Sequence, residues 1–524
     1  MKSMGKTKIS ILLLGYSALA SLLVIVFYSF AYSGVALSLA ALASLIYIFK
    51  SERSKFSSIL YLLILILSFF IFSRTNEFLI FLNIIFMFFL GSVMAMPREF
   101  TRNSFGFLHF LITPIFLFFR SIYTKSEYDV DLRQFLEKEA KPKSEKIIEL
   151  IISVAVSIVL LAIIVPLLAS ANPVFNKLLT NFPGIIYLRE FFKWFFSDNI
   201  SIWIFRLIFF GFLAFIVPRL LTFIQKGQEI NSLKFNSLKF INLSLPKALS
   251  SIVLFIFFLT QLQFYLSTSE TLLAMGITHS QYTREVFAQL LVVALIILGL
   301  VYNAKERSKI SKALTVILVF EGIFLSFIAL KSVYDYSFYW GFTHKRLWGF
   351  TAAFWIMGVF SFFIFKYLKD ITNSFFVKSV IIFSGFVLIA VNILNFDFLI
   401  YHYRKSVTHR GVDYLYLSRL SSDSGSYGEQ FQILEQSVID KDKYYPDYYN
   451  YSFPGQNLLR RIKKLQDKYK NLDLRTFNLS EYLQYQEIKS IDTEKYMSLW
   501  APVPPRVPFL PGEGPEIIMQ EDMP

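Results

Sequence analysis

The sequence predicts an all-α integral membrane protein with about eleven transmembrane helices and a small α-helical extracytoplasmic C-terminal domain. Hydrophobic residues make up 55% of the 524 residues and charged residues only 17%, whereas soluble chains carry about 25% charged residues. Apolar stretches long enough to cross a bilayer recur along the chain. After Phe396 the composition changes, and polar residues replace the runs of Phe, Ile and Leu. These observations exclude a disordered chain and argue against an ordinary soluble enzyme.

Eleven stretches meet the length that a bilayer core about 30 Å thick requires, which is roughly 20 apolar helical residues. The second stretch follows the first almost at once, so the first is not a cleaved signal peptide. Two shorter or amphipathic stretches, 105–119 and 183–196, are expected to lie in the membrane interface. If 105–119 crossed instead, every later loop would change sides. The predicted spans are 10–29, 33–49, 57–73, 78–96, 147–169, 201–224, 248–268, 283–303, 313–332, 347–367 and 376–396.

The distribution of basic residues predicts the orientation. With the N-terminus in the cytoplasm, the inner segments hold 24 Lys and Arg and the outer loops hold 6, as the positive-inside rule requires. Eleven spans then place the C-terminal segment outside the cytoplasm. We expect four parts, which are a four-span region with a basic cytoplasmic loop (1–146), a seven-span core (147–398), a soluble helical segment (399–500) and a flexible Pro-rich tail (501–524).

The soluble segment shows helical patterns at 429–440, 457–470 and 479–489. The middle pattern places five apolar residues on one stripe, and basic residues cover much of the rest of the helix. This helix either belongs to the surface of a small domain or rests on anionic lipid headgroups. Asn478 or Ser480 is positioned to cap the third helix. The residues of the stripe are Leu458, Leu459, Ile462, Leu465 and Tyr469.

The sequence shows no motif for catalysis, metal binding or a cofactor. The chain has no Cys, which excludes disulfides, thiolate zinc sites and thiol nucleophiles. Its five His residues lie on separate segments, and no phosphate-binding, HExxH or GxSxG pattern occurs. We therefore expect no catalytic residue, no metal and no cofactor. The net charge of +15 is attributed to cytoplasmic loops, so no nucleic-acid partner is expected.

The most informative polar residue inside a span is Glu321, near the middle of the stretch 313–332. An ionisable side chain at membrane depth is costly and indicates a functional site. Candidate partners come from neighbouring spans, namely Gln261, Arg284, Glu285 and Gln289. Together these residues could form a pocket for an ion, a proton or a lipid headgroup. The alternative is a structural hydrogen-bond network that ties helices together, with Arg284 and Glu285 reaching into the interface.

Six short motifs stand in order along the chain: Gln261-Leu-Gln-Phe, Tyr282-Thr-Arg-Glu-Val-Phe-Ala-Gln-Leu290, Trp340-Gly-Phe-Thr-His-Lys-Arg-Leu, Asn395-Phe-Asp-Phe-Leu-Ile-Tyr-His-Tyr, Asp413-Tyr-Leu-Tyr-Leu-Ser-Arg-Leu-Ser-Ser-Asp423 and Leu474-Arg-Thr-Phe-Asn-Leu-Ser480. They resemble a bacterial multipass membrane family catalogued as domain of unknown function 4173, which is related to domain of unknown function 4153. The resemblance covers about residues 150–485 and implies a bacterial membrane protein without transferring catalytic residues. Phe396 replaces a proline of the family pattern. The resemblance draws attention to six residues on the predicted outer side, which are Gln261, Tyr282, Arg284, Gly341, Arg346 and Asp397.

Three functional classes follow from these features. The first is a non-enzymatic envelope scaffold or sensor in the bacterial cytoplasmic membrane, which presents its outer C-terminal domain to a protein partner. The alternative is a transporter or lipid-handling membrane protein that uses the polar pocket around Glu321. A third option is an integral subunit of a larger complex, suggested by the Phe-rich spans. All three share the lipid bilayer as their environment.

Overall fold

The computed structural model describes residues 32–50, 53–96, 309–369, 371–404, 412–439, 448–471 and 476–499, together with short pieces between 210 and 301. Every regular element in these parts of the chain is helical. Five helices are long and apolar enough to cross a membrane, which indicates a membrane protein. They are α3 (Lys55–Ser73), α4 (Glu77–Ala95), α15 (Lys309–Trp340), α16 (His344–Leu368) and α17 (Asn373–Leu394).

These five helices confirm the predicted spans 57–73, 78–96, 313–332, 347–367 and 376–396 to within a few residues. The predicted span 33–49 forms α2 (Tyr32–Phe49), a slightly shorter apolar helix. The other predicted spans, and the interfacial stretches 105–119 and 183–196, lie wholly or partly outside the described residues. The number eleven and the orientation therefore stay predictions.

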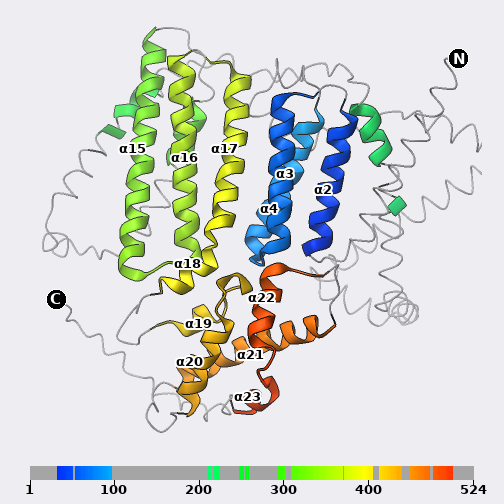
Figure 1. Ribbon diagram of the computed structural model, residues 1–524. Coiled ribbons are helices and arrows are strands. Elements are labelled where there is room, and N and C mark those ends of the chain that lie inside the picture. The colour runs from blue at the N-terminus through cyan, green and yellow to red at the C-terminus, as the bar shows by residue number, and fades with distance from the viewer. Residues whose placement is uncertain are drawn as a thin grey trace, which may run out of the picture.

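The spans form two groups that stand side by side (Figure 1). Helices α15, α16 and α17 make one group, and α2, α3 and α4 make the other, with α17 packed against α3. The C-terminal helices lie across one end of both groups, next to the N-terminal ends of α4 and α16. They are α18 (Phe396–His402), α19 (Tyr414–Leu417), a 3-10 turn (Ser422–Ser424), α20 (Tyr427–Ile439), α21 (Tyr448–Lys470), α22 (Leu479–Ile488) and α23 (Thr493–Leu499).

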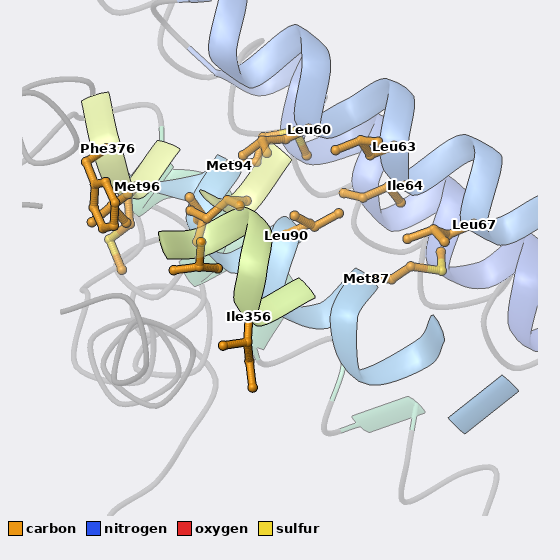
Figure 2. Close-up of a cluster of buried hydrophobic side chains, with 14 of the residues drawn as sticks. Leu60, Leu63, Ile64, Leu67, Met87, Leu90, Met94, Met96, Ile356 and Phe376 are labelled. Atoms are coloured by element: carbon orange, nitrogen blue, oxygen red, sulfur yellow. The ribbon is translucent and has the colours of Figure 1, made fainter. Parts of the chain in front are cut away.

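The spans pack through apolar ridges and a few buried polar contacts. Leu60 and Leu67 of α3 are fully buried, and Leu67 lies beside Met87 of α4 (Figure 2). In addition, Asn83 of α4 and Asn392 of α17 exchange two side-chain hydrogen bonds of 2.9 and 3.0 Å, and both are fully buried. Lipid offers no amide partner, so a reciprocal pair of this kind joins the two groups of spans.

The C-terminal helices confirm the predicted patterns. Helices α20, α21 and α22 match 429–440, 457–470 and 479–489 closely, apart from an earlier start of α21. The whole apolar stripe of α21 is buried against neighbouring helices, so α21 is a surface helix of a packed layer. Asn478 caps α22 by accepting a hydrogen bond from the N–H of Glu481 at 3.2 Å. Which side of the membrane this layer occupies stays a prediction.

Candidate functional site

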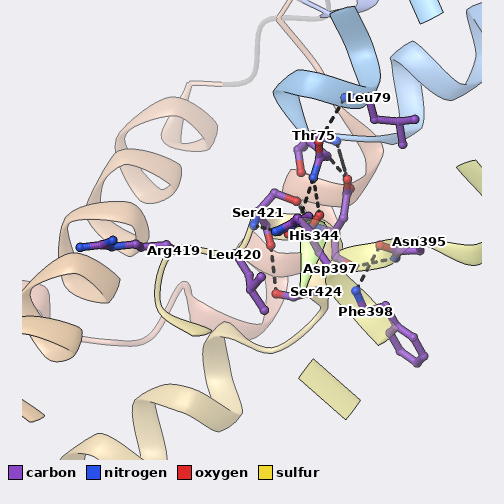
Figure 3. A network of polar contacts seen from close by, with 12 residues as sticks. Thr75, Leu79, His344, Asn395, Asp397, Phe398, Arg419, Leu420, Ser421 and Ser424 are labelled. Carbon is purple, nitrogen blue, oxygen red and sulfur yellow. Dashed lines mark hydrogen bonds and ion pairs between the residues drawn. The ribbon is translucent and has the colours of Figure 1, made fainter. Parts of the chain in front are cut away.

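A polar network joins the ends of the spans to the C-terminal helices, and we call it the junction network (Figure 3). The loop between α3 and α4, the start of α16 and the turn between α17 and α18 contribute to it from the spans. The segment around the 3-10 turn contributes from the other side. Its members are Thr75, Asn76, His344, Asn395, Asp397, Tyr416, Ser421 and Asp423.

Asp397 lies at the centre of this network, in the first turn of α18, and is only 1% exposed. Its carboxylate accepts hydrogen bonds from the Asn76 side-chain amide at 2.7 Å, the His344 Nε2 at 3.2 Å and the Ser421 backbone N–H at 3.1 Å. Burial by itself would raise the pKa of Asp397. The hydrogen bond and charge of His344, with the donors of Asn76 and Ser421, outweigh burial and lower this pKa below its ordinary value of 3.8.

Asp423 is a second buried carboxylate, and it lies against the start of α4. Its two oxygens accept hydrogen bonds from the backbone N–H of Thr75 at 3.0 and 2.9 Å, and from that of Asn76 at 3.0 Å. A negative charge is favourable at a helix N-terminus, where free N–H groups gather. Burial nevertheless raises the pKa of Asp423, although the N–H of Thr75 acts to lower it, and the nearby carboxylate of Asp397 adds to the rise.

His344 connects Asp397 to Tyr416. The Tyr416 hydroxyl lies 3.0 Å from the Nδ1 of His344 and accepts the backbone N–H of the same residue at 3.0 Å. The Nε2 lies 3.2 Å from a carboxylate oxygen of Asp397, so both ring nitrogens have a hydrogen-bond partner within the network. In this arrangement His344 positions its neighbours and has no nitrogen left to act as a base on a ligand.

Asn395 forms the turn that brings Asp397 into place. Its φ of 48° is left-handed, a conformation that Asn tolerates better than most residues. The residue ends α17 and begins α18, where its side-chain oxygen accepts the N–H of Phe398. Its side-chain amide donates to the carbonyl of Asp423 at 2.7 Å. One residue therefore sets the direction of α18 and also holds the segment that carries the second carboxylate.

A second set of contacts joins α22 to the loop after α3. The Asn478 side-chain amide donates to the carbonyl of Arg74 at 2.8 Å. Beside it, the rings of Phe72 and Phe477 lie with centroids 5.4 Å apart. The C-terminal helices are thus attached to both groups of spans.

A cavity of about 990 Å³ opens next to the junction network. Its floor includes His344 and Asp397. One wall is apolar and comes from α4 and α16, with Phe78, Leu82, Trp348 and Ala352. The basic part of the lining comes from the start of α16, the segment after α19 and helix α21, with Lys345, Arg419, Arg461 and Lys464. This size lies within the range of small-molecule sites, which are roughly 300–1,000 Å³.

The site predicted from the sequence lies elsewhere. Glu321 is in the middle of α15, where its Oε1 accepts a hydrogen bond of 2.9 Å from Ser251 and its buried Oε2 has no hydrogen-bond partner among the residues that the structure describes. Nearby, the ammonium group of Lys247 donates to the hydroxyl of Thr315 at 2.6 Å. The proposed partners Gln261, Arg284, Glu285 and Gln289 lie outside the described residues.

The sequence reasoning identified part of the junction. The predicted residues Gly341, Arg346 and Asp397 all lie at this end of the spans. His344 and Asp423 lie within the motifs Trp340–Leu347 and Asp413–Asp423, which are the available signal for them. Thr75 and Asn76 carry no signal, because each is an ordinary polar residue in a loop or at a helix end. Within the parts of the chain that the structure describes, no three His, Asp or Glu side chains converge as metal ligands.

Comparison with known proteins finds one family. A model described as domain of unknown function DUF4153 matches residues 59–427, which is more than half of the chain. No curated protein and no solved structure matches. The matched segment contains the whole junction network and ends at Tyr427, before α21 begins.

Proposed function

The chain belongs to the DUF4153 family of unknown function, and on that premise we propose that it is a non-enzymatic scaffold or sensor of the bacterial cytoplasmic membrane. The proposal includes eleven spans, a cytoplasmic N-terminus and C-terminal helices outside the cytoplasm. The proposal also assigns the chain to the related family catalogued as domain of unknown function 4173. The four-part division at 146, 398 and 500 belongs to the same proposal.

The junction network is the observation that carries this proposal. A scaffold or sensor must transmit position or force between its membrane part and the surface that it presents. Two buried carboxylates, Asp397 and Asp423, accept hydrogen bonds from the loop between α3 and α4 and from the start of α16. Both ring nitrogens of His344 have hydrogen-bond partners within the network, which supports a positioning role for His344 over a catalytic one.

The exposed face of the C-terminal helices is where a protein partner would bind. Leu483 on α22 is 57% exposed and Leu415 on α19 is 37% exposed. A photo-crosslinking amino acid at Leu483 should capture another envelope protein in native membranes, whereas the same probe at the exposed Lys309 of the opposite end should not. Capture at neither position, or equal capture at both, would contradict the scaffold role.

The absence of Cys in the native chain makes the topology testable without background. We expect Gln486→Cys to react with a membrane-impermeant thiol reagent on intact cells and Lys309→Cys to react only after permeabilisation. Both positions are exposed and lie at opposite ends of the spans. The reverse pattern would place the C-terminal helices in the cytoplasm and refute the outward-facing proposal.

A second candidate function is transport or lipid handling through the pocket around Glu321. The polar side chains that favour it follow one side of α15, where Lys247 meets Thr315 and Ser251 meets Glu321. The unpartnered Oε2 of Glu321 would be satisfied by a proton or by the proposed partners Gln261, Arg284, Glu285 and Gln289. In proteoliposomes, Glu321→Gln should change proton or ion flux; unchanged flux with Glu321→Ala would refute this function.

A further inference from the structure

The cavity at the junction combines an apolar surface with a basic one. Phe78 and Leu82 lie one turn apart on α4, and Trp348 and Ala352 lie one turn apart on α16. The rings of Phe78 and Trp348 meet edge to face with centroids 5.0 Å apart. Since a helix rises about 1.5 Å per residue, the apolar wall runs roughly 10 Å from the span ends along the membrane helices.

The apolar wall is partly exposed at the outside of the spans. Phe78 is 52% exposed, and Leu82, Trp348 and Ala352 are half-buried. These side chains belong to two spans, so in a membrane the open part of the groove faces acyl chains. A hydrocarbon chain could therefore enter along α4 and α16 without crossing water.

The basic wall has an excess of positive charge. No ion pair joins Lys345, Arg419, Arg461 or Lys464 to a carboxylate in the part of the chain that the structure describes. The Arg461 guanidinium donates instead to neutral groups, the carbonyl of Arg419 at 2.8 Å and the hydroxyl of Tyr427 at 3.2 Å. These contacts fix its position without neutralising it.

Three carboxylates also line the cavity, and two of them are engaged. Asp397 accepts the three hydrogen bonds described above, and Glu481 is paired with Lys468. Glu77, at the start of α4, is the remaining acid. Four cations thus face one unengaged carboxylate, and the positive ends of α4 and α16 point toward the same space. This balance favours an anion over a neutral or cationic ligand.

We propose that this cavity is a binding site for an anionic amphiphile, with a phosphate-bearing headgroup against Lys345, Arg419, Arg461 and Lys464 and an acyl chain along Phe78, Leu82, Trp348 and Ala352. The headgroup then lies at the level of the span ends, where charged groups of a bilayer are found, and the chain lies at membrane depth. The volume of about 990 Å³ accommodates a headgroup and part of a chain. The site goes beyond the scaffold or sensor role, since it holds whether or not the C-terminal helices recruit a protein.

Native mass spectrometry of the purified full-length protein tests the charge requirement, with dioleoyl-phosphatidylglycerol and dioleoyl-phosphatidylcholine as probes. We expect the anionic lipid to bind more tightly. Each cation near a membrane surface strengthens such binding by about fivefold, so Lys345→Gln combined with Lys464→Gln should weaken it roughly 25-fold. Both side chains are exposed, and their removal should leave the fold intact.

The matched control removes two cations of α21 that lie outside the cavity, Arg460→Gln with Lys470→Gln. Both are exposed, so the net charge changes equally and affinity should stay within twofold. Equal binding of the two lipids by the unmodified protein would overturn the proposal. So would equal weakening by the two double variants, because that result would mean a diffuse attraction to the whole surface.

A further pair of measurements separates a lipid from a free anion. Ala352→Phe narrows the apolar groove and should weaken the binding of dioleoyl-phosphatidylglycerol, while millimolar inorganic phosphate should compete poorly with this lipid. If Ala352→Phe has no effect and inorganic phosphate displaces the lipid completely, the cavity is a phosphate site and the assignment to an amphiphile is wrong.

Discussion

Replacement of Asp397 by Ala should release the C-terminal helices from the spans. The carboxylate is buried and accepts hydrogen bonds from Asn76, His344 and Ser421. Its removal leaves three partly buried donors without this acceptor. Breaking a buried charged pair by removing one partner costs about 3–5 kcal/mol. We therefore expect the free energy of detachment to fall by that amount.

A more conservative change isolates one of the three contacts. In Asp397→Asn the remaining oxygen can still accept from Ser421 and His344, but the new amide faces the amide of Asn76. The Asn76 side chain cannot turn over without cost, because its oxygen accepts the N–H of Leu79 at 3.1 Å and caps α4. One hydrogen bond to a charged group is lost, so we expect a loss of about 1.5–3 kcal/mol.

Hydrogen exchange of the full-length protein in nanodiscs measures both effects. Protection of amides in 412–430 should fall by roughly two to four orders of magnitude in Asp397→Ala, since about 1.4 kcal/mol corresponds to a factor of ten. The decrease in Asp397→Asn should be smaller, and amides of α3 should keep their protection in both variants.

Asp467→Asn on the exposed side of α21 is the control, and it should exchange like the unmodified protein. The reasoning is refuted if Asp397→Ala also exchanges within threefold of the unmodified protein, because the network would then contribute almost nothing to attachment. It is equally refuted if 412–430 and α3 lose protection together, which would mean general unfolding.

Three further outcomes follow from the packing and the charges. Asn83→Leu leaves its partner amide on α17 without its reciprocal bonds, and should lower thermal stability by about 0.6–2 kcal/mol, with partial recovery when both Asn residues become Leu. Gly322→Ala places a Cβ 2.5 Å from a buried Phe ring and should cost about 1–3 kcal/mol in the same thermal assay, whereas Gly299→Ala, with nothing within 4 Å, should be neutral. Burial raises the pKa of Asp423, so its contribution to the free energy of attachment is full below about pH 3.8 and is lost as the pH rises through the raised pKa. The pKa of Asp397 is lowered, so its contribution to the same free energy is full above about pH 3.8 and is lost as the pH falls through the lowered pKa. Attachment measured by hydrogen exchange should therefore be strongest near the ordinary carboxyl pKa of about 3.8, and Asp423→Asn should remove the decrease toward neutral pH; a flat profile in the unmodified protein would contradict this.

The spans could be predicted from the sequence because their signal is local. A stretch such as 376–396 carries its own evidence of length and hydropathy, and α17 begins and ends within three residues of it. The cap at Asn478 is also local, since donor and acceptor are three residues apart. Such local patterns can be recognised in the sequence without knowledge of contacts to distant parts of the chain.

The junction network could not be predicted in the same way. Asp423 binds Thr75 across 348 residues of sequence, and no periodicity marks either residue. The sequence instead drew attention to Glu321, because a charge inside an apolar run is conspicuous. Asp397 and Asp423 lie in segments that already look polar, where a buried carboxylate cannot be told from an exposed one.

The segment that the family model matches ends at Tyr427, between the two groups of basic residues that line the cavity. Residues 59–427 include every member of the junction network, so the matched segment contains the whole attachment between the span ends and the segment 395–424. Of the basic wall, Lys345 and Arg419 lie inside that segment, whereas Arg461 and Lys464 belong to α21 beyond it. The network can therefore hold the junction without α21, but the excess of positive charge in the cavity depends on α21 being packed against it. Removing α21 should consequently abolish the preference for an anionic ligand before it abolishes the contacts of Asp397.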